Sequence, residues 1–324
     1  MRRLAYYQRI FSAYLLRKNS HLTFWHDLSE ANEHARADRL GEYYMTFSQK
    51  ADYAGPFDDA GVPLLDYRGQ IGKQYNPIAI AQYGLANHNR ISRDPDPQSR
   101  RKKFLVASDW LVAHQEPNAH GVPVWNHKFD WEYRDTLKAP WYSGLAQGQG
   151  ISLLVRAHQE TGDEKYLQAA HRAFGSFLKT TSDGGVLFRD QQGGVWIEEY
   201  LVDPPTHILN GMIWAAWGIH DYFLATGDAQ ARGLFGDVVD TLASNLARYD
   251  LGFWSLYEQS GTRLRMIASP FYHRLHIVQL RVLHQLTGRA IFQEYADRWE
   301  KYAGSRVRRM AALCYKSAFK LCYY

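Results

Sequence analysis

Apolar and polar positions follow a helical period through most of the chain after Pro77. Three stretches share one plan, which is an apolar-periodic helix, a Thr-Gly turn and a second periodic helix. The turns lie at residues 161–162, 226–227 and 287–288, where glycine suits the left-handed conformation that ends many helices. An earlier pair, "IAIAQYGLANHN" and then "KKFLVASDWLVAHQ", extends the series to four. The pattern predicts a mainly α fold, an incomplete (α/α) toroid of about four helical hairpins around a central cleft.

The segments that lead into the four predicted inner helices are the most distinctive in the chain. They read "QYNPIAIAQYGL", "APWYSGLAQGQG", "DPPTHILNG" and "SPFYHRLHIVQL", and three of them have proline near the expected helix start. If the four helices run the same way around a ring, their N-termini meet at one end of the cleft. Helix N-termini carry partial positive charge, so this end is suited to an anion.

The chain divides into three predicted parts. Residues 1–75 form an N-terminal segment with short strands or extended runs, "EYYMTF" and "GVPLLDY", that packs on the next part. Residues 76–304 form the toroid-like catalytic domain, and residues 305–324 form a basic amphipathic tail. The tail and residues 1–20 both mix basic and apolar positions, as plain surface helices do. The alternative is an amphipathic helix lying on an anionic membrane.

Charge and composition limit the classes of molecule that the protein is expected to bind. The net charge is +5 with a pI near 9.0, which favours polyanions. The chain shows no zinc-finger spacing, RNP-like motif or Gly-rich phosphate loop, which argues against nucleic acid. Because the 22 Tyr and 10 Trp offer faces that suit sugar rings, an acidic glycan is the better prediction.

The predicted compartment is the cytoplasm, and the inner face of the membrane is the more specific alternative. The two cysteines, Cys314 and Cys322, provide no disulfide framework, and this fits a reducing environment. The first twenty residues have no small-residue cleavage site, and their apolar run is too interrupted for a membrane span.

Acidic and phenolic side chains gather beside the predicted helix starts. The stretch 193–211 contains Glu198, Glu199 and Tyr200, and Tyr257 and Tyr272 follow near the last inner helix. Together these groups can take and give protons on two sides of a bound ring. A tyrosine works as a base only when a cation lowers its pKa. The candidate cations are His273, His276, Arg263, Arg265 and Arg274.

The competing interpretation of each tyrosine alone is a packed core ring with a satisfied hydroxyl. The histidines at 207, 273, 276 and 284 suggest a metal, but no HExxH or Cys/His spacing accompanies them. We therefore predict no metal and no cofactor.

Several motifs, in this order, resemble the C-terminal domain of the D-glucuronyl C5-epimerase family: "NPIAIAQYGL", "WYSGLAQGQGISLLVRA", "EEY" before "ILNG", "SLYE" and "YHRLHIVQL". The resemblance covers roughly residues 61–304. It implies a helical toroid, a homodimer in many cases, and conversion of glucuronate to iduronate in heparan-type polysaccharides. It also implies a catalytic set and a substrate-binding asparagine, which correspond here to Glu199, Tyr200, Tyr257, Tyr272 and Asn210.

One position departs from the family pattern. The animal enzymes have Arg-Trp-Asp directly before the last tyrosine, where this chain has Ser269, Pro270 and Phe271. An arginine that could hold the substrate carboxylate is therefore missing there, and Arg263 or Arg265 could compensate. The full set of predicted substrate-binding residues is Asn210, Glu198, Tyr142, Gln147, Gln82, Arg263, Arg265, His273 and His276.

The predicted reaction inverts C5 of a uronate. A base on one face removes the C5 hydrogen and an acid on the other face returns one, with Tyr200 aided by Glu199 on one face, Tyr272 on the other, and Tyr257 as the third candidate. Loss of a C4 leaving group would instead give a polysaccharide lyase. Hydrolysis by Glu198 and Glu199 is disfavoured because neighbours on an extended segment point opposite ways. A non-catalytic glycan-binding module is the remaining alternative.

Overall fold

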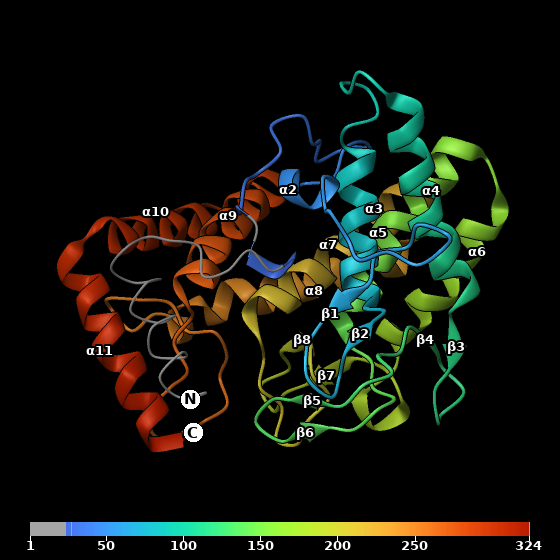
Figure 1. The fold of residues 1–324 in the computed structure, drawn as a ribbon. Helices are drawn as coiled ribbons and strands as arrows, with labels where there is room; N and C mark the ends of the chain where they lie inside the picture. The colour runs from blue at the N-terminus through green and yellow to red at the C-terminus, as the bar shows by residue number, and fades with distance from the viewer. Residues whose placement is uncertain (1–23, 27, 324) are drawn as a thin grey trace.

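The computed structural model describes residues 24–26 and 28–323. Within this range the long helices form four hairpins in chain order. They are α3 (Pro77–His88) with α4 (Pro97–Ala113), α5 (Gly144–Thr161) with α6 (Glu164–Phe174), α7 (Leu209–Thr226) with α8 (Ala229–Asn245), and α9 (Pro270–Thr287) with α10 (Ala290–Gly304). In Figure 1 the first two pairs lie on one side of the molecule and the last pair on the other, with α7 and α8 between them. This arrangement confirms the predicted incomplete (α/α) toroid.

The three Thr-Gly turns end α5, α7 and α9 as predicted. Gly162, Gly227 and Gly288 follow these helices with φ of 69°, 71° and 69°, the left-handed conformation that glycine adopts without a steric penalty. Each glycine N–H donates to the carbonyl four residues earlier. The sequence repeat is therefore also a repeat of backbone geometry.

Side-chain caps fix where three inner helices begin. Asn76 accepts from the backbone N–H groups at the start of α3, Ser143 accepts from that of Ala146 in α5, and Ser269 accepts from that of Tyr272 in α9. Proline occupies the first turn of α3 and α9. These caps set the position at which each chain segment turns from the cleft into its helix.

Glycines let the central inner helices approach closely. A Cβ on Gly148 of α5 would lie 2.5 Å from the Cα of Ala215 in α7, and a Cβ on Gly218 would overlap the backbone of Gly148. Gly148 in "GLAQGQG" therefore serves the packing of α5 on α7.

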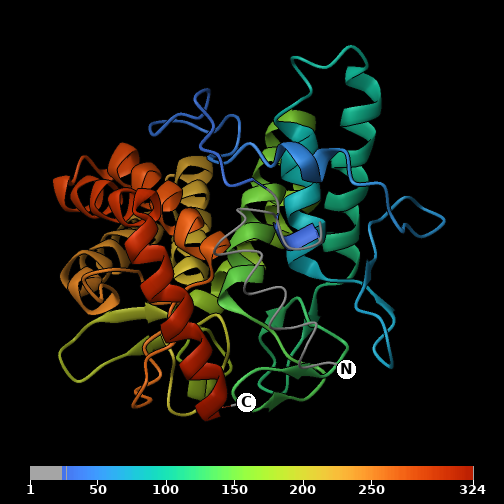
Figure 2. The same ribbon diagram turned by 60° about the vertical axis from the view of Figure 1, so that its left-hand side comes forward.

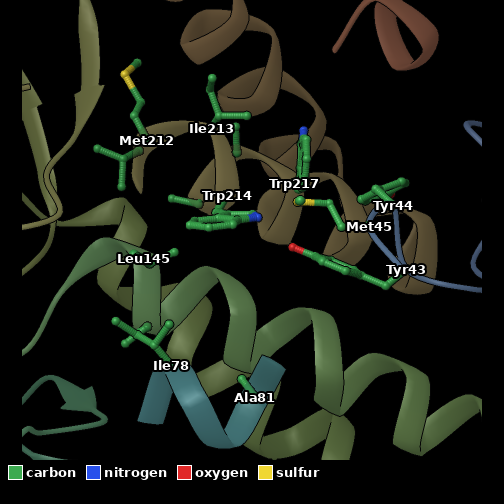
Figure 3. Close-up of a cluster of buried hydrophobic side chains, with 14 of the residues drawn as sticks. Tyr43, Tyr44, Met45, Ile78, Ala81, Leu145, Met212, Ile213, Trp214 and Trp217 are labelled. Atoms are coloured by element: carbon green, nitrogen blue, oxygen red, sulfur yellow. The ribbon is translucent and has the colours of Figure 1, made fainter. Parts of the chain in front are cut away.

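The segment before α3 bridges the first and last inner helices. The backbone N–H of Tyr43 donates to Asn89 Oδ1 just after α3 (2.6 Å), and Gln285 of α9 donates to the carbonyl of Ala35 (3.2 Å). Figure 3 shows Tyr43 facing Trp217 of α7, and their ring centroids are 6.0 Å apart. This segment also contains the 3₁₀ turn η1 (Phe24–His26) and the short helix α2 (Ser48–Ala51).

A buried ion pair ties this segment to the core. Arg156 of α5 donates to Asp221 of α7 at 2.7 and 3.2 Å, and to the carbonyl of Gly41 at 2.8 Å. Tyr44 donates its hydroxyl to the same carboxylate at 2.7 Å. Because the pair is fully buried, each charge depends on the other for its stability.

Short antiparallel hairpins gather near one end of the inner helices (Figures 1 and 2). They are β1 (Leu65–Asp66) with β2 (Lys73–Gln74), β3 (Glu116–Pro117) with β4 (Pro123–Val124), β5 (Trp131–Glu132) with β6 (Thr136–Leu137), and β7 (Leu187–Arg189) with β8 (Val195–Ile197). Further 3₁₀ turns are η2 (Gly175–Leu178), η3 (Thr181–Asp183) and η4 (Leu246–Tyr249). The predicted N-terminal runs are mostly extended, and they contribute β1 and an isolated bridge between Ala31 and Met45. The hairpins inside the helical part were not predicted, since strands of two or three residues leave no period in the sequence.

The predicted tail is helix α11 (Arg306–Tyr323), which packs Leu313 and Phe319 inward and leaves Val307 and Leu321 exposed. No helix among the described residues is both long and apolar enough to cross a bilayer. The predicted amphipathic segment at residues 1–20 lies outside the described residues. Membrane association and the homodimer stay predictions.

Candidate active site

The starts of all four inner helices contribute to one pocket, as the sequence predicted. Asn76 and Gln82 come from the α3 region, Leu145 from α5, Asn210 from α7 and Tyr272 from α9. The cavity measures about 120 Å³, similar to the ~150 Å³ of a cavity that holds one benzene ring. Its other lining residues are Trp25, Leu28, Ser29, Met45, Phe47, Lys50, Tyr67, Ile78, Phe129, Trp131, Trp141, Glu199, Tyr200, Trp214, Phe271 and Leu275. Such a pocket, aromatic with a few polar groups, accommodates about one sugar-sized ring.

Glu199 and Tyr200 lie shortly after β8, with Glu198 between the strand and this pair, and both line the pocket. Gly211, in the first turn of α7, leaves room for the carboxylate, because a Cβ there would overlap Glu199 Oε2. Asn210 Nδ2 donates to the same oxygen at 3.4 Å. A glycine and an amide at the start of α7 therefore hold Glu199 in place.

Burial controls the protonation of Glu199. Only 5% of this residue is exposed. The pKa of its carboxyl is raised from 4.5 to about 8, chiefly by burial; the hydrogen bond with Tyr200 lowers the pKa, and the nearby Glu198 raises it. At neutral pH most molecules therefore hold Glu199 neutral, with a pKa close to that of an effective general base.

Three phenols surround this carboxyl. Tyr200 and Tyr272 line the pocket, and Tyr257 packs edge-on against Tyr272 with ring centroids 4.9 Å apart. Burial raises the pKa of all three hydroxyls, and a negative charge on Glu199 raises each of them further. The four groups therefore form one coupled cluster that favours a single negative charge at a time.

Tyr257 and Tyr272 are not equivalent. Their hydroxyl contact lowers the pKa of Tyr272 and raises that of Tyr257, although burial keeps both pKa values above the ordinary tyrosine value. The contact therefore favours an ionised Tyr272 that accepts a hydrogen bond from the neutral Tyr257 hydroxyl. This arrangement makes Tyr272 the easier of the two to ionise.

The two adjacent glutamates point apart, as expected for an extended segment. Glu198 accepts from the backbone N–H of His207 at 3.1 Å and contacts its ring Nδ1 at 2.5 Å. The His207 ring stacks on Trp196. Glu198 is therefore a buried structural partner beside the site, outside the pocket lining, and does not form an acid and nucleophile pair with Glu199.

The predicted cations do not line the pocket. His273 contacts Ser255 Oγ at 2.7 Å, and burial lowers its pKa to about 3. Burial likewise holds the pKa of His276 well below its ordinary value, so both rings are neutral. The guanidinium of Arg265 donates to the carbonyl of Arg248 beside a different surface hollow.

Arg263 and Arg274 also lie outside the pocket lining. Arg263 is exposed in the loop after Tyr257, and Arg274 is 57% exposed near Glu300. The structure thus brings Glu199 and the tyrosines together, but separates them from the charges nearest in sequence.

The predicted polar binding residues divide into two groups. Asn210 and Gln82 line the pocket, and their side-chain carbonyl oxygens have no hydrogen-bond partner among the described residues. A sugar hydroxyl is a donor that could satisfy them. Gln147 is buried beyond the lining, and Tyr142 donates its hydroxyl to the Gly184 carbonyl at 2.9 Å.

Sequence reasoning missed a cation from the N-terminal segment. Lys50 of α2 lines the pocket and is 5% exposed. No spacing or motif links it to Glu199, so only folding reveals its position. Phe271, at the departure from the family pattern, also lines the pocket as an apolar wall. Within the part of the chain that the structure describes, no group of three or more potential metal ligands is clustered.

Sequence comparison relates this chain to a known family. The family described as D-glucuronyl C5-epimerase C-terminus matches residues 119–301. The D-glucuronyl C5-epimerase of Caenorhabditis elegans is 32% identical over 222 residues, which are 63% of this chain and 36% of that protein. An uncharacterized protein of Methanocaldococcus jannaschii is 28% identical over 222 residues, 64% of this chain and 70% of that protein. The chain thus spans little more than a third of the C. elegans relative.

Structure comparison finds distant likenesses. An unsaturated glucuronyl hydrolase of Bacillus sp. GL1 aligns with a TM-score of 0.45 and 16% identity, over 71% of this chain and 62% of that one. A β-1,3-1,4-glucanase of Paenibacillus sp. X4 aligns with a TM-score of 0.45 and 10% identity, over 84% of this chain and 76% of the glucanase chain. Likeness at this level does not bear on the substrate.

Proposed function

Because this chain belongs to the D-glucuronyl C5-epimerase family, we propose that it inverts C5 of D-glucuronate residues in an acidic polysaccharide to give L-iduronate. The observation that carries the proposal is the coupled cluster of Glu199, Tyr200, Tyr257 and Tyr272 at one ring-sized pocket. A carboxyl with a pKa near 8 beside neutral phenols supplies both a base and an acid in one site.

Glu199 and Tyr200 serve one face of the sugar ring. Glu199 ionises more readily than the phenols, so its carboxylate is the base available to the cluster near neutral pH, and the Tyr200 hydroxyl contacts it. This pair accepts the C5 hydrogen as a proton, and the electron pair passes to the adjacent carboxyl group as an enediolate-like species. Stabilising that charge is the main electrostatic task of the site.

Tyr272 serves the opposite face. Its neutral hydroxyl returns a proton to C5, and the hydrogen bond from Tyr257 supports the phenolate that remains. One proton enters the cluster and one leaves it, so the net charge is unchanged. The coupling between Glu199 and the phenols suits a site that carries one negative charge, first on one face and then on the other.

The test is proton exchange with solvent. Incubation with a non-sulfated glucuronan such as heparosan in deuterated water should place deuterium at C5 and produce iduronate signals by NMR. Ultraviolet absorbance from unsaturated uronate would instead reveal a lyase, and new reducing ends without it a hydrolase. Binding without exchange would leave a glycan-binding module.

The roles of the phenols have a separate test. Tyr200→Phe and Tyr272→Phe each remove only a hydroxyl, and each should cut exchange by about 100-fold or more. Near-normal exchange in both variants would refute the roles proposed here without affecting the fold.

A further inference from the structure

A C5 epimerase needs positive charge near the substrate carboxylate, because that group takes up the electron pair in the transition state. Phe271 leaves the position before Tyr272 apolar, and Arg263 and Arg265 lie outside the pocket lining. Among the described residues that line the pocket, Lys50 is the one basic side chain.

The ammonium group of Lys50 has a defined position. Its Nζ donates to the carbonyl oxygen of Phe24 at 2.5 Å and lies 4.4 Å from the centroid of the Phe24 ring. The ring of Phe47 is 5.6 Å away on another side. A carbonyl oxygen and aromatic faces stabilise a cation in a buried place and hold it at the pocket wall.

The backbone next to Lys50 supports this placement. Phe47 precedes α2 with φ 47° and ψ 37°, a left-handed conformation that bulky residues rarely adopt. The same residue lines the pocket and is 3% exposed. Such strain persists only where the surrounding structure fixes it, and it is common at functional sites.

The described lining of the pocket carries little negative charge of its own. Glu199 is the one acidic side chain among the described lining residues, and its raised pKa keeps it mostly neutral at pH 7. The family match begins at residue 119, so it assigns no role to Lys50.

We propose that Lys50 binds the carboxylate of the uronate residue in the pocket and stabilises the charge that develops there. The inference rests on the proposed function for the identity of the ligand. Lys50 takes the place of the arginine that the animal enzymes have before the last tyrosine, although it comes from a different part of the chain.

The contact between Lys50 and the substrate carboxylate is tested by comparing two proteins, each with two ligands. The wild type and Lys50→Met are titrated with a heparosan oligosaccharide and with the same oligosaccharide after reduction of its carboxyl groups to alcohols. Lys50→Met should weaken binding of the uronate ligand by about 10- to 100-fold, as expected for a hydrogen bond to a charged group, and leave the reduced ligand almost unchanged. Lys102→Met, at an exposed position of α4, is the matched control and should bind like the wild type.

Equal weakening of both ligands would assign Lys50 a structural role and overturn the proposal, as would no weakening of either. If Lys50→Met does not fold, the wild type and Lys50→Arg decide the question. A preference of both for the uronate ligand supports the proposal, and equal affinity for the two ligands refutes it. A wild type that shows the ligand preference but no deuterium exchange would refute the epimerase function and leave the Lys50 contact standing.

Discussion

Replacing Glu199 with glutamine should abolish exchange at C5 and also make the protein more stable at alkaline pH. The carboxyl is buried, and its pKa rises from 4.5 to about 8 on folding. Between pH 4.5 and about pH 8, Glu199 keeps its proton in the folded protein but has released it in the unfolded chain. The stabilising effect is complete below about pH 4.5 and is lost as pH rises through about 8.

The magnitude follows from that shift. Stability declines by about 1.4 kcal/mol per pH unit while only the unfolded chain is ionised, so the wild type should lose about 3 kcal/mol relative to Glu199→Gln between roughly pH 5.5 and pH 9. Glutamine keeps the shape and does not titrate, so the variant lacks this contribution. Urea unfolding at a series of pH values measures the difference, provided that the m-values agree.

Glu294→Gln on the exposed face of α10 is the control, and its unfolding free energy should follow that of the wild type. If the unfolding free energies of the wild type and Glu199→Gln changed with pH in parallel, Glu199 would titrate alike in the folded and unfolded states. That result would refute the predicted loss of stability at alkaline pH. A second readout comes from the same shift. Exchange by the wild type should increase as pH rises through about 8, where Glu199 becomes the ionised base.

Three further substitutions test separate parts of the structure. Gly211→Ala places a Cβ where the Glu199 carboxylate lies, and should cut kcat for exchange by about 10-fold or more with little loss of helix by circular dichroism; full activity would contradict the described packing. Asp221→Asn leaves the buried guanidinium of Arg156 without its charge partner and should lower the unfolding free energy by about 3–5 kcal/mol in urea titrations. A loss below about 1 kcal/mol would mean that the ion pair is not buried in solution. Tyr257→Phe removes the donor to Tyr272 and should reduce kcat by about 10- to 100-fold with little change in KM, whereas an unchanged kcat would exclude Tyr257 from the proton path.

The sequence alone determined the repeating architecture. Helical periodicity and the Thr-Gly turns depend on local backbone preferences, so the hairpins could be predicted from residues close together in the chain. The distinctive helix starts and the acid beside Tyr200 likewise identified the end of the cleft where the pocket lies. The opposite directions of Glu198 and Glu199 followed from the two-residue period of an extended strand.

Only the tertiary structure decided the electrostatics of the pocket. Arg265 and His273 are close to Tyr272 in sequence, yet one faces a different hollow and the other is neutral in the core. Lys50 is far from Glu199 in sequence but reaches the same pocket through a four-residue helix that leaves no periodic signal. Burial sets the pKa of Glu199, and burial is a property of the whole assembled chain. Distances between charges arise when segments remote in sequence pack together, and for this reason local patterns located the site but did not reveal which cation lines it.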